Sequence, residues 1–195
     1  MSAASILAEQ IVMAGLTNGR RHDITYRAGL VMQVLGAAVL AVLYPLENPF
    51  YTVGIMLFEA GVLLSAVYLL VWMSWIKMII LGVVAAGIAL QAAGLYAPEE
   101  HAGTIIIGGI GLVCAGAAGM AGKEAYCFRY VEGWLLMLPG FPLMVLANLL
   151  VKENRIFNTV GFAALFLLLL FLAGKKLKES LLSPCSANVC GTQGT

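Results

Sequence analysis

Long apolar stretches recur along the whole sequence and limit its fold more than any other feature. Of the 195 residues, 62% are hydrophobic and 11% are charged, which is more apolar surface than a soluble domain of this length can bury. A membrane-spanning helix needs about 20 mainly apolar residues, and six stretches approach that length. They are Arg27–Tyr44, Phe50–Trp72, Lys77–Tyr96, Gly103–Gly122, Gly133–Val151 and Ile156–Gly174. The sequence therefore predicts an all-α, polytopic membrane helix bundle with six transmembrane helices.

The second break between these stretches is the least marked, because Phe50–Tyr96 is nearly continuous apolar sequence. A straight helix of its 47 residues would be about 70 Å long, more than twice the thickness of the hydrocarbon core. The chain must therefore turn within this stretch. We place the turn at residues 73–77, because Trp72, Trp75 and Lys77 are residue types of the membrane interface.

Lysine and arginine are distributed unevenly between the two predicted surfaces of the bundle. Lys152 and Arg155 fall on one side. The others fall on the opposite side and are Arg20, Arg21, Arg27, Lys77, Lys123, Arg129, Lys175, Lys176 and Lys178. Because cytoplasmic loops are rich in lysine and arginine, we expect both termini in the cytoplasm and an even number of spans. The expected location is the cytoplasmic (inner) membrane, as a multi-pass protein.

This topology divides the chain into three regions. We expect residues 1–26 to form a cytoplasmic N-terminal segment, residues 27–174 the six-helix transmembrane domain, and residues 175–195 a flexible cytoplasmic tail. Within the first region, residues 6–16 form either a short amphipathic helix on the membrane surface or part of a loosely ordered tail. The Thr-Asn-Gly sequence at residues 17–19 ends that helix, and a polar turn follows.

Away from the ends of the predicted spans, Glu59 is the only charged residue. It lies about 14 Å along the second span, close to the bilayer midplane, where an ionisable group is costly and is a candidate functional residue. We expect a protonated, hydrogen-bonded carboxyl group. It is either a proton or cation site, or a packing residue that hydrogen-bonds to Gln33, Gln91, Ser65 or a backbone carbonyl group.

The fourth span is rich in glycine. Gly111, Ala115 and Gly119 form a stripe of small residues, which allows another helix to approach closely. A phosphate-binding loop is disfavoured, because the glycines follow no predicted strand and precede no Lys-Ser or Lys-Thr pair. We therefore expect tight helix packing along this span.

Two prolines and a glycine interrupt the fifth span. Pro139, Gly140 and Pro142 must kink or break the helix, because proline removes a backbone hydrogen bond. A simple kink is one interpretation. The other is a broken helix that exposes backbone dipoles to a substrate.

A dense polar block follows the fourth span at the predicted membrane surface, where we expect it to meet lipid headgroups or a partner protein. It contains Lys123, Glu124, Tyr126, Cys127, Phe128 and Arg129. Cys127 lies one helical turn after Lys123, which favours a reactive thiolate, and an inert buried thiol is the alternative. Cys114 and Cys127 lie too far apart along one helix for a disulfide.

The sequence does not contain the residues that several classes of function require. A net charge of +1 leaves no basic face for nucleic acid. His22 and His101 lie outside the spans, so no histidine pair is placed to hold a membrane haem, and Cys185 and Cys190 lack further ligands for zinc. We expect no metal and no cofactor, and we favour a protein that is not an enzyme.

Three short blocks carry a resemblance to a known family. They are Tyr26-Arg27-Ala28-Gly29-Leu30, Lys123-Glu124-Ala125-Tyr126-Cys127-Phe128 and Ala173-Gly174-Lys175-Lys176. From about Tyr26 to Leu181, the chain resembles the integral membrane proteins of bacteria, notably cyanobacteria, and of plastids that form domain of unknown function 2301. The resemblance implies a polytopic membrane protein and implies no activity or catalytic residue.

Three functions remain open for a chain embedded in a lipid bilayer. The first is a non-catalytic protein that packs with or helps to assemble membrane components, including other membrane proteins or copies of itself. The second is a small-solute or proton-coupled transporter or channel that uses Glu59. The third is a thiol redox protein that uses Cys127.

Overall fold

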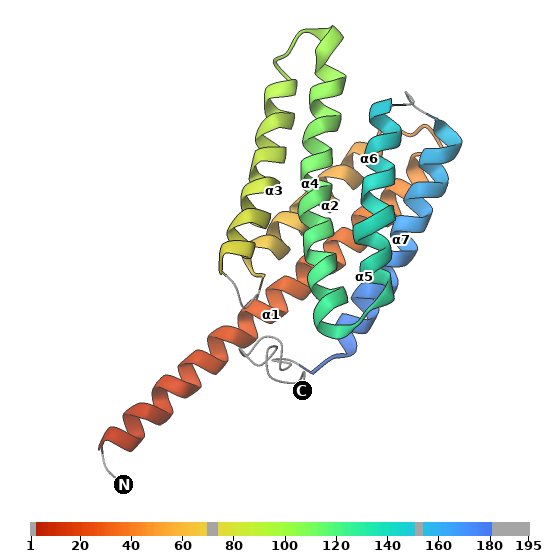
Figure 1. Ribbon diagram of the computed structural model, residues 1–195. Helices are drawn as coiled ribbons and strands as arrows, with labels where there is room; N and C mark the ends of the chain where they lie inside the picture. Colours follow the sequence, from red (N-terminus) through yellow and green to blue (C-terminus); the bar gives the residue numbers. More distant parts are fainter. Residues whose placement is uncertain (1–2, 70–73, 151–153, 181–195) are drawn as a thin grey trace.

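The structure, a computed structural model, is built from helices (Figure 1) and describes residues 3–69, 74–150 and 154–180. In chain order its elements are α1 (Ala3–Leu43), α2 (Tyr51–Val67), α3 (Ser74–Gly94), α4 (Glu99–Phe128), α5 (Val131–Leu135), the π-helix η1 (Leu136–Gly140), α6 (Phe141–Leu150) and α7 (Arg155–Lys178). No strand occurs within those three ranges.

Five helical segments are long and apolar enough to cross a membrane. They are Gly19–Leu43 of α1, Trp75–Gly94 of α3, α4, the continuous unit α5–η1–α6, and α7. The helix α2 is shorter, with 17 residues. The predicted all-α bundle of apolar helices is thus confirmed, and the number of six spans stays a prediction.

The helices α1 and α2 form one hairpin, and α3 and α4 form a second (Figure 1). Glycines lie where the paired backbones come closest. A Cβ atom on Gly36 would lie 2.5 Å from the backbone nitrogen of Phe58, and one on Gly109 would lie 2.7 Å from the carbonyl oxygen of Gly87. Each hairpin can therefore close only because these residues carry no side chain.

The stripe of small residues on α4 contacts two different neighbours. A Cβ atom on Gly111 would meet Val145 of α6 at 2.8 Å, whereas one on Gly119 would meet Ile80 of α3 at 3.2 Å. Tight packing of the fourth span is confirmed. The stripe is not a single seam, because α4 packs against both α3 and α6.

The helix end predicted at residues 17–19, with a polar turn after it, is wrong, because α1 continues without a break through this region. The polar residues that follow belong to the helix. Asp23 and Arg27 form an ion pair of 2.9 Å one turn apart, an arrangement that stabilises a helix. The first part of α1 consequently projects from the bundle as a continuous helix (Figure 1).

The turn predicted at residues 73–77 is also misplaced. The helix α2 already ends at Val67, and α3 begins at Ser74. Tyr68 follows α2 and packs edge-to-face on His22, with ring centroids 5.2 Å apart. The chain thus leaves α2 beside the polar part of α1, where an amphipathic tyrosine is favoured. Trp72 lies outside the described residues.

At the predicted interruption of the fifth span, the structure has a π-helical segment within a continuous helical unit. Pro139 lies inside η1, which joins α5 to α6 without reversing the chain direction. Gly140 ends η1, and Pro142 lies in the first turn of α6. The wider π-helical turn accommodates a proline that cannot donate a backbone hydrogen bond.

The two ends of the bundle differ in character. At one end, Tyr26, Glu124 and Lys176 come together from α1, α4 and α7, and we call it the charged end. At the opposite end, Arg155 pairs with Glu47, and its guanidinium group donates to the carbonyl oxygen of Pro45 at 2.6 Å. We call this second region the loop end.

Candidate functional site

A group of buried polar residues at the charged end forms what we call the charge cluster: Tyr26, Lys123, Glu124, Lys176 and Glu179. The side chain of Glu124 is 0% exposed. Its Oε1 accepts hydrogen bonds from the Tyr26 hydroxyl at 2.8 Å and from Lys123 Nζ at 2.9 Å. Its Oε2 lies 3.2 Å from Lys176 Nζ as an ion pair without hydrogen-bond geometry. One carboxylate thus joins three helices.

Lys176 connects the charge cluster to the end of α7. Its side chain is 3% exposed, its Nζ donates to Glu179 at 2.9 Å, and the same atom lies 3.8 Å from the ring centroid of Phe128. Carboxylates and an aromatic face therefore replace the water that a buried ammonium group loses.

Further contacts tie the segment after α7 to the rest of the bundle. The Arg27 guanidinium group donates to the carbonyl oxygens of Glu179 at 2.9 Å and Ser180 at 3.2 Å. The Tyr130 hydroxyl donates to the Glu179 carboxylate. Burial and that hydrogen bond raise the pKa of Tyr130 above its usual range, so the phenol remains a donor. The charge cluster therefore holds neighbouring helices together and is not an open binding site.

The predicted docking block divides between the interior and the surface. Glu124 is enclosed and the side chain of Lys123 is 12% exposed, so the expectation that both meet headgroups or a partner is wrong. α4 continues through Phe128 and packs this part of the block against α1 and α7. Tyr126, which is 78% exposed, and Arg129 do face outward.

The three blocks of sequence that carry the family resemblance meet in this cluster. Tyr26 comes from the first block, Lys123 and Glu124 from the second, and Lys176 from the third. In the sequence, these three blocks are far apart. Their opposite charges at predicted cytoplasmic ends were the signal that could have suggested an ion pair.

The structure describes two of the four cysteines. Cys114 and Cys127 are not joined by a disulfide, and Cys127 is partly buried. Cys185 and Cys190 lie outside the described residues. Within the described ranges, no group of three His, Cys, Asp or Glu side chains is placed to hold a metal ion.

A cavity of about 330 Å³, which we call the central cavity, lies between α1, α2, α4, α6 and α7. Most of its wall is apolar, with isoleucines from α2 and α4 and leucines from α1 and α7. Its polar residues are Tyr44, Tyr51, Thr52, Glu59, Asn148 and Asn158. A mainly apolar hollow with a few converging polar groups is the usual form of a small-molecule site.

Glu59 lies in the wall of the central cavity and also bonds to a neighbouring helix. Its Oε1 accepts a hydrogen bond of 2.7 Å from Gln91 Nε2 of α3. Of the hydrogen-bond partners predicted for Glu59, Gln91 is therefore the one that bonds to it. Gln33 is not, because its amide donates to Gly61 O at 3.3 Å and Ser65 Oγ at 3.1 Å, where it joins α1 to α2.

Two asparagines in the same wall were missed from the sequence. Asn148 of α6 and Asn158 of α7 donate to each other at 2.9 Å in both directions. Asn158 also donates to the Tyr44 hydroxyl at 3.0 Å. Their position as amide side chains inside the predicted fifth and sixth spans was the available signal, because such groups seek partners within a bundle.

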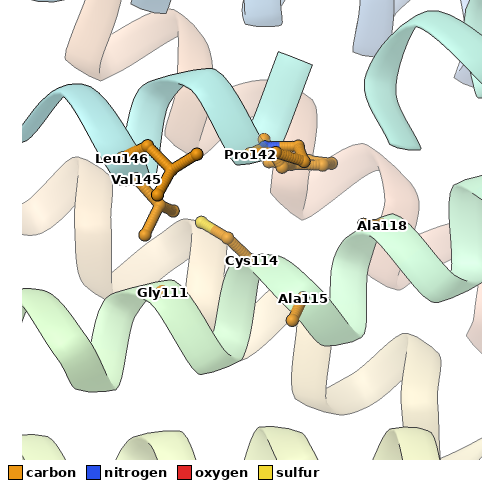
Figure 2. A pocket seen from close by; sticks show the side chains of 8 residues that line it. Gly111, Cys114, Ala115, Ala118, Pro142, Val145 and Leu146 are labelled. Carbon is orange, nitrogen blue, oxygen red and sulfur yellow. The ribbon is translucent and has the colours of Figure 1, made fainter. Parts of the chain in front are cut away.

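A second hollow, of about 220 Å³, opens between α4 and α6 and is called the outer hollow (Figure 2). Cys114 points from α4 toward Val145 of α6. The outer hollow includes the exposed residues Pro142 and Leu146, so it lies on the outside of the bundle.

No protein-family model, curated protein or solved structure matches this chain. The resemblance to domain of unknown function 2301 therefore stays a prediction. Function has to be argued from the geometry of the two hollows and of the charge cluster.

Proposed function

We propose that this chain is a multi-pass membrane protein that binds a small, largely apolar solute in the central cavity. One observation carries the proposal: Glu59, Asn148 and Asn158 converge from three helices on a hollow that is otherwise mainly apolar. Its volume of about 330 Å³ lies within the usual range of ligand pockets. The solute would place an apolar body against the isoleucines and leucines and one polar group against these side chains.

Glu59 is suited to bind the polar group of the solute. Gln91 occupies its Oε1, and no second partner of this carboxyl group lies among the described residues. The other oxygen is thus available to accept a hydrogen bond, or to donate one if protonated. Asn148 and Asn158 already satisfy each other, so they help to shape the cavity more than they need a ligand.

The closed charge cluster favours binding over conduction. A channel needs a continuous path between the two ends of the bundle. At the charged end, Glu124 and Lys176 are buried and bonded to neighbouring helices. A solute in the central cavity would have to separate these charges in order to pass, at a cost of several kcal/mol.

Six spans with both termini in the cytoplasm fit this proposal. The helix α2 has 17 residues, about 25 Å in length, which lies at the lower limit for crossing a bilayer. Lys123, Arg27 and Lys176 lie at the charged end, whereas Arg155 lies at the loop end, as the positive-inside rule requires for a cytoplasmic charged end. Labelling of single cysteines placed in the loops would test this orientation in the cytoplasmic membrane.

The assembly and thiol hypotheses stay predictions with less support. Lys123 and Glu124 are engaged within the chain, which leaves Tyr126 and Arg129 to contact another membrane protein or a second copy. For Cys127, partial burial of the side chain limits its access to a substrate.

Photoaffinity labelling tests the proposed binding. The purified protein, in lipid nanodiscs, is irradiated with a medium-chain alcohol that carries a diazirine, and labelled residues are located by mass spectrometry. We expect labels on residues of the central cavity and competition by the non-photoreactive alcohol.

Matched variants locate the site. Ile110→Trp places a large ring in the cavity wall and should abolish the cavity labels. Ile79→Trp, on a position of α3 that is 54% exposed, should leave them unchanged. Labels spread over the outer helix faces and insensitive to Ile110→Trp would overturn the proposal.

A further inference from the structure

We propose that the solute enters the central cavity sideways from the hydrocarbon of the bilayer, between α4 and α6. Its class is therefore an uncharged molecule dissolved in the membrane. This inference rests on the proposed function and adds the route and the chemical class of the ligand.

The central cavity and the outer hollow are back to back. Cys114, Phe141 and Val145 line both of them, so these side chains form a shared wall. On the outer side, Gly111 and Ala115 of α4 contribute little bulk. A short movement of the shared side chains would therefore join the two hollows.

Phe141 is the main barrier in this wall. It is 2% exposed, and its ring packs against the ring of Phe58, another residue of the cavity wall, with ring centroids 6.1 Å apart. It is also the first residue of α6, directly after η1. Its backbone N–H donates to the carbonyl oxygen of Leu136, so opening of the wall would depend on movement of the ring rather than of the backbone.

The chemistry of the passage selects the ligand. Every residue that lines the outer hollow is apolar apart from the thiol of Cys114. A charged solute would lose its hydration there without gaining a partner, which costs several kcal/mol or more. An apolar solute loses nothing by leaving the hydrocarbon for such a surface.

The kinetics of photolabelling test the route. Protein in nanodiscs is mixed with the diazirine alcohol and irradiated by a short flash after varied delays, which gives the rate at which the central cavity fills. Leu146 lines the outer hollow only and is 51% exposed. Leu146→Trp should slow filling about tenfold, equivalent to a barrier raised by about 1.4 kcal/mol, and should leave the final labelling unchanged. Leu146→Ala should not slow it.

Matched controls separate the route from other effects. Leu143 lies on the same helix, is 56% exposed and lines neither hollow, so Leu143→Trp should leave the rate unchanged. Thr52→Trp narrows the central cavity where α2 begins and should slow filling by less than Leu146→Trp.

The outcomes of these labelling experiments distinguish failure of the proposed binding from failure of the sideways route. A wild-type protein whose cavity is never labelled would overturn the proposed function itself. A labelled cavity that fills at the wild-type rate in Leu146→Trp would overturn only the sideways route. Slowing by Thr52→Trp alone would instead assign entry to the loop end.

Discussion

Removing the charge of Glu124 should destabilise the protein strongly. Glu124→Gln preserves the shape of the side chain and leaves one carbonyl oxygen for the Tyr26 hydroxyl and Lys123. It also removes the negative charge that faces the ammonium groups of Lys123 and Lys176 at 2.9 and 3.2 Å. Breaking a buried ion pair from one side costs about 3–5 kcal/mol.

In this structure, the loss in the free energy of unfolding caused by Glu124→Gln should lie near the lower limit of the range of about 3–5 kcal/mol. Lys176 retains Glu179 at 2.9 Å, and the side chain of Lys123 is 12% exposed, so neither ammonium group is left wholly without compensation. We therefore expect a loss of about 3 kcal/mol in the free energy of unfolding. Equilibrium unfolding in mixed micelles, followed by circular dichroism, measures it.

The chain offers a matched control at the same end of the bundle. Glu132 pairs with Lys175, whose side chain is 46% exposed, and an exposed pair contributes at most about 1 kcal/mol. Glu132→Gln should therefore have a small effect. The double variant Glu124→Gln/Lys123→Met should recover part of the stability lost in Glu124→Gln. If Glu124→Gln and Glu132→Gln were equally stable, the charge cluster would not stabilise the bundle as argued.

Three further perturbations test the cavity and the helix packing. Glu59→Gln should leave the thermal unfolding of the protein unchanged, because the amide oxygen still accepts from Gln91. It should lower occupancy of the central cavity by the photoreactive alcohol up to about tenfold, since the NH2 group that replaces the second oxygen cannot accept from the alcohol and a net hydrogen bond contributes about 0.5–1.5 kcal/mol. Equal occupancy would exclude Glu59 as the polar contact. Asn158→Leu should lower the free energy of unfolding by about 1–3 kcal/mol, because Asn148 loses its partner, and an unchanged unfolding curve would contradict the pairing. Gly36→Ala should lower the free energy of unfolding by about 1–3 kcal/mol through steric overlap. At Gly174 an added Cβ would meet nothing within 4 Å, so Gly174→Ala should be neutral or stabilising by up to about 1 kcal/mol. The reverse order of stabilities would refute the glycine contact between α1 and α2.

The positions of the apolar helices follow largely from the sequence. Hydropathy and length are local properties, so most helix ends were predicted within a few residues. Pro139 marked the interruption of the fifth span, because its chemistry removes a hydrogen bond wherever it lies. The errors at residues 17–19 and 73–77 both arose where the local signals were weak: Thr-Asn-Gly did not end α1, and interfacial residue types did not mark the turn between α2 and α3.

The roles of the polar residues required the tertiary structure. Glu59 was recognised as unusual because its charge lies far inside an apolar span, but only the packing of α2 beside α3 selects Gln91 as its partner. The pairing of Asn148 with Asn158 was not predicted, because it arises only when α6 and α7 bring the two amide groups together.

The charge cluster shows the same division most clearly. From the sequence, Tyr26, Glu124 and Lys176 could be placed near the ends of predicted helices, because helix length fixes the position of each residue along its helix. The sequence did not determine which way each side chain points around its helix. That rotation is set by contacts among α1, α4 and α7, residues far apart in the sequence, and it turned an apparent surface block into a buried network.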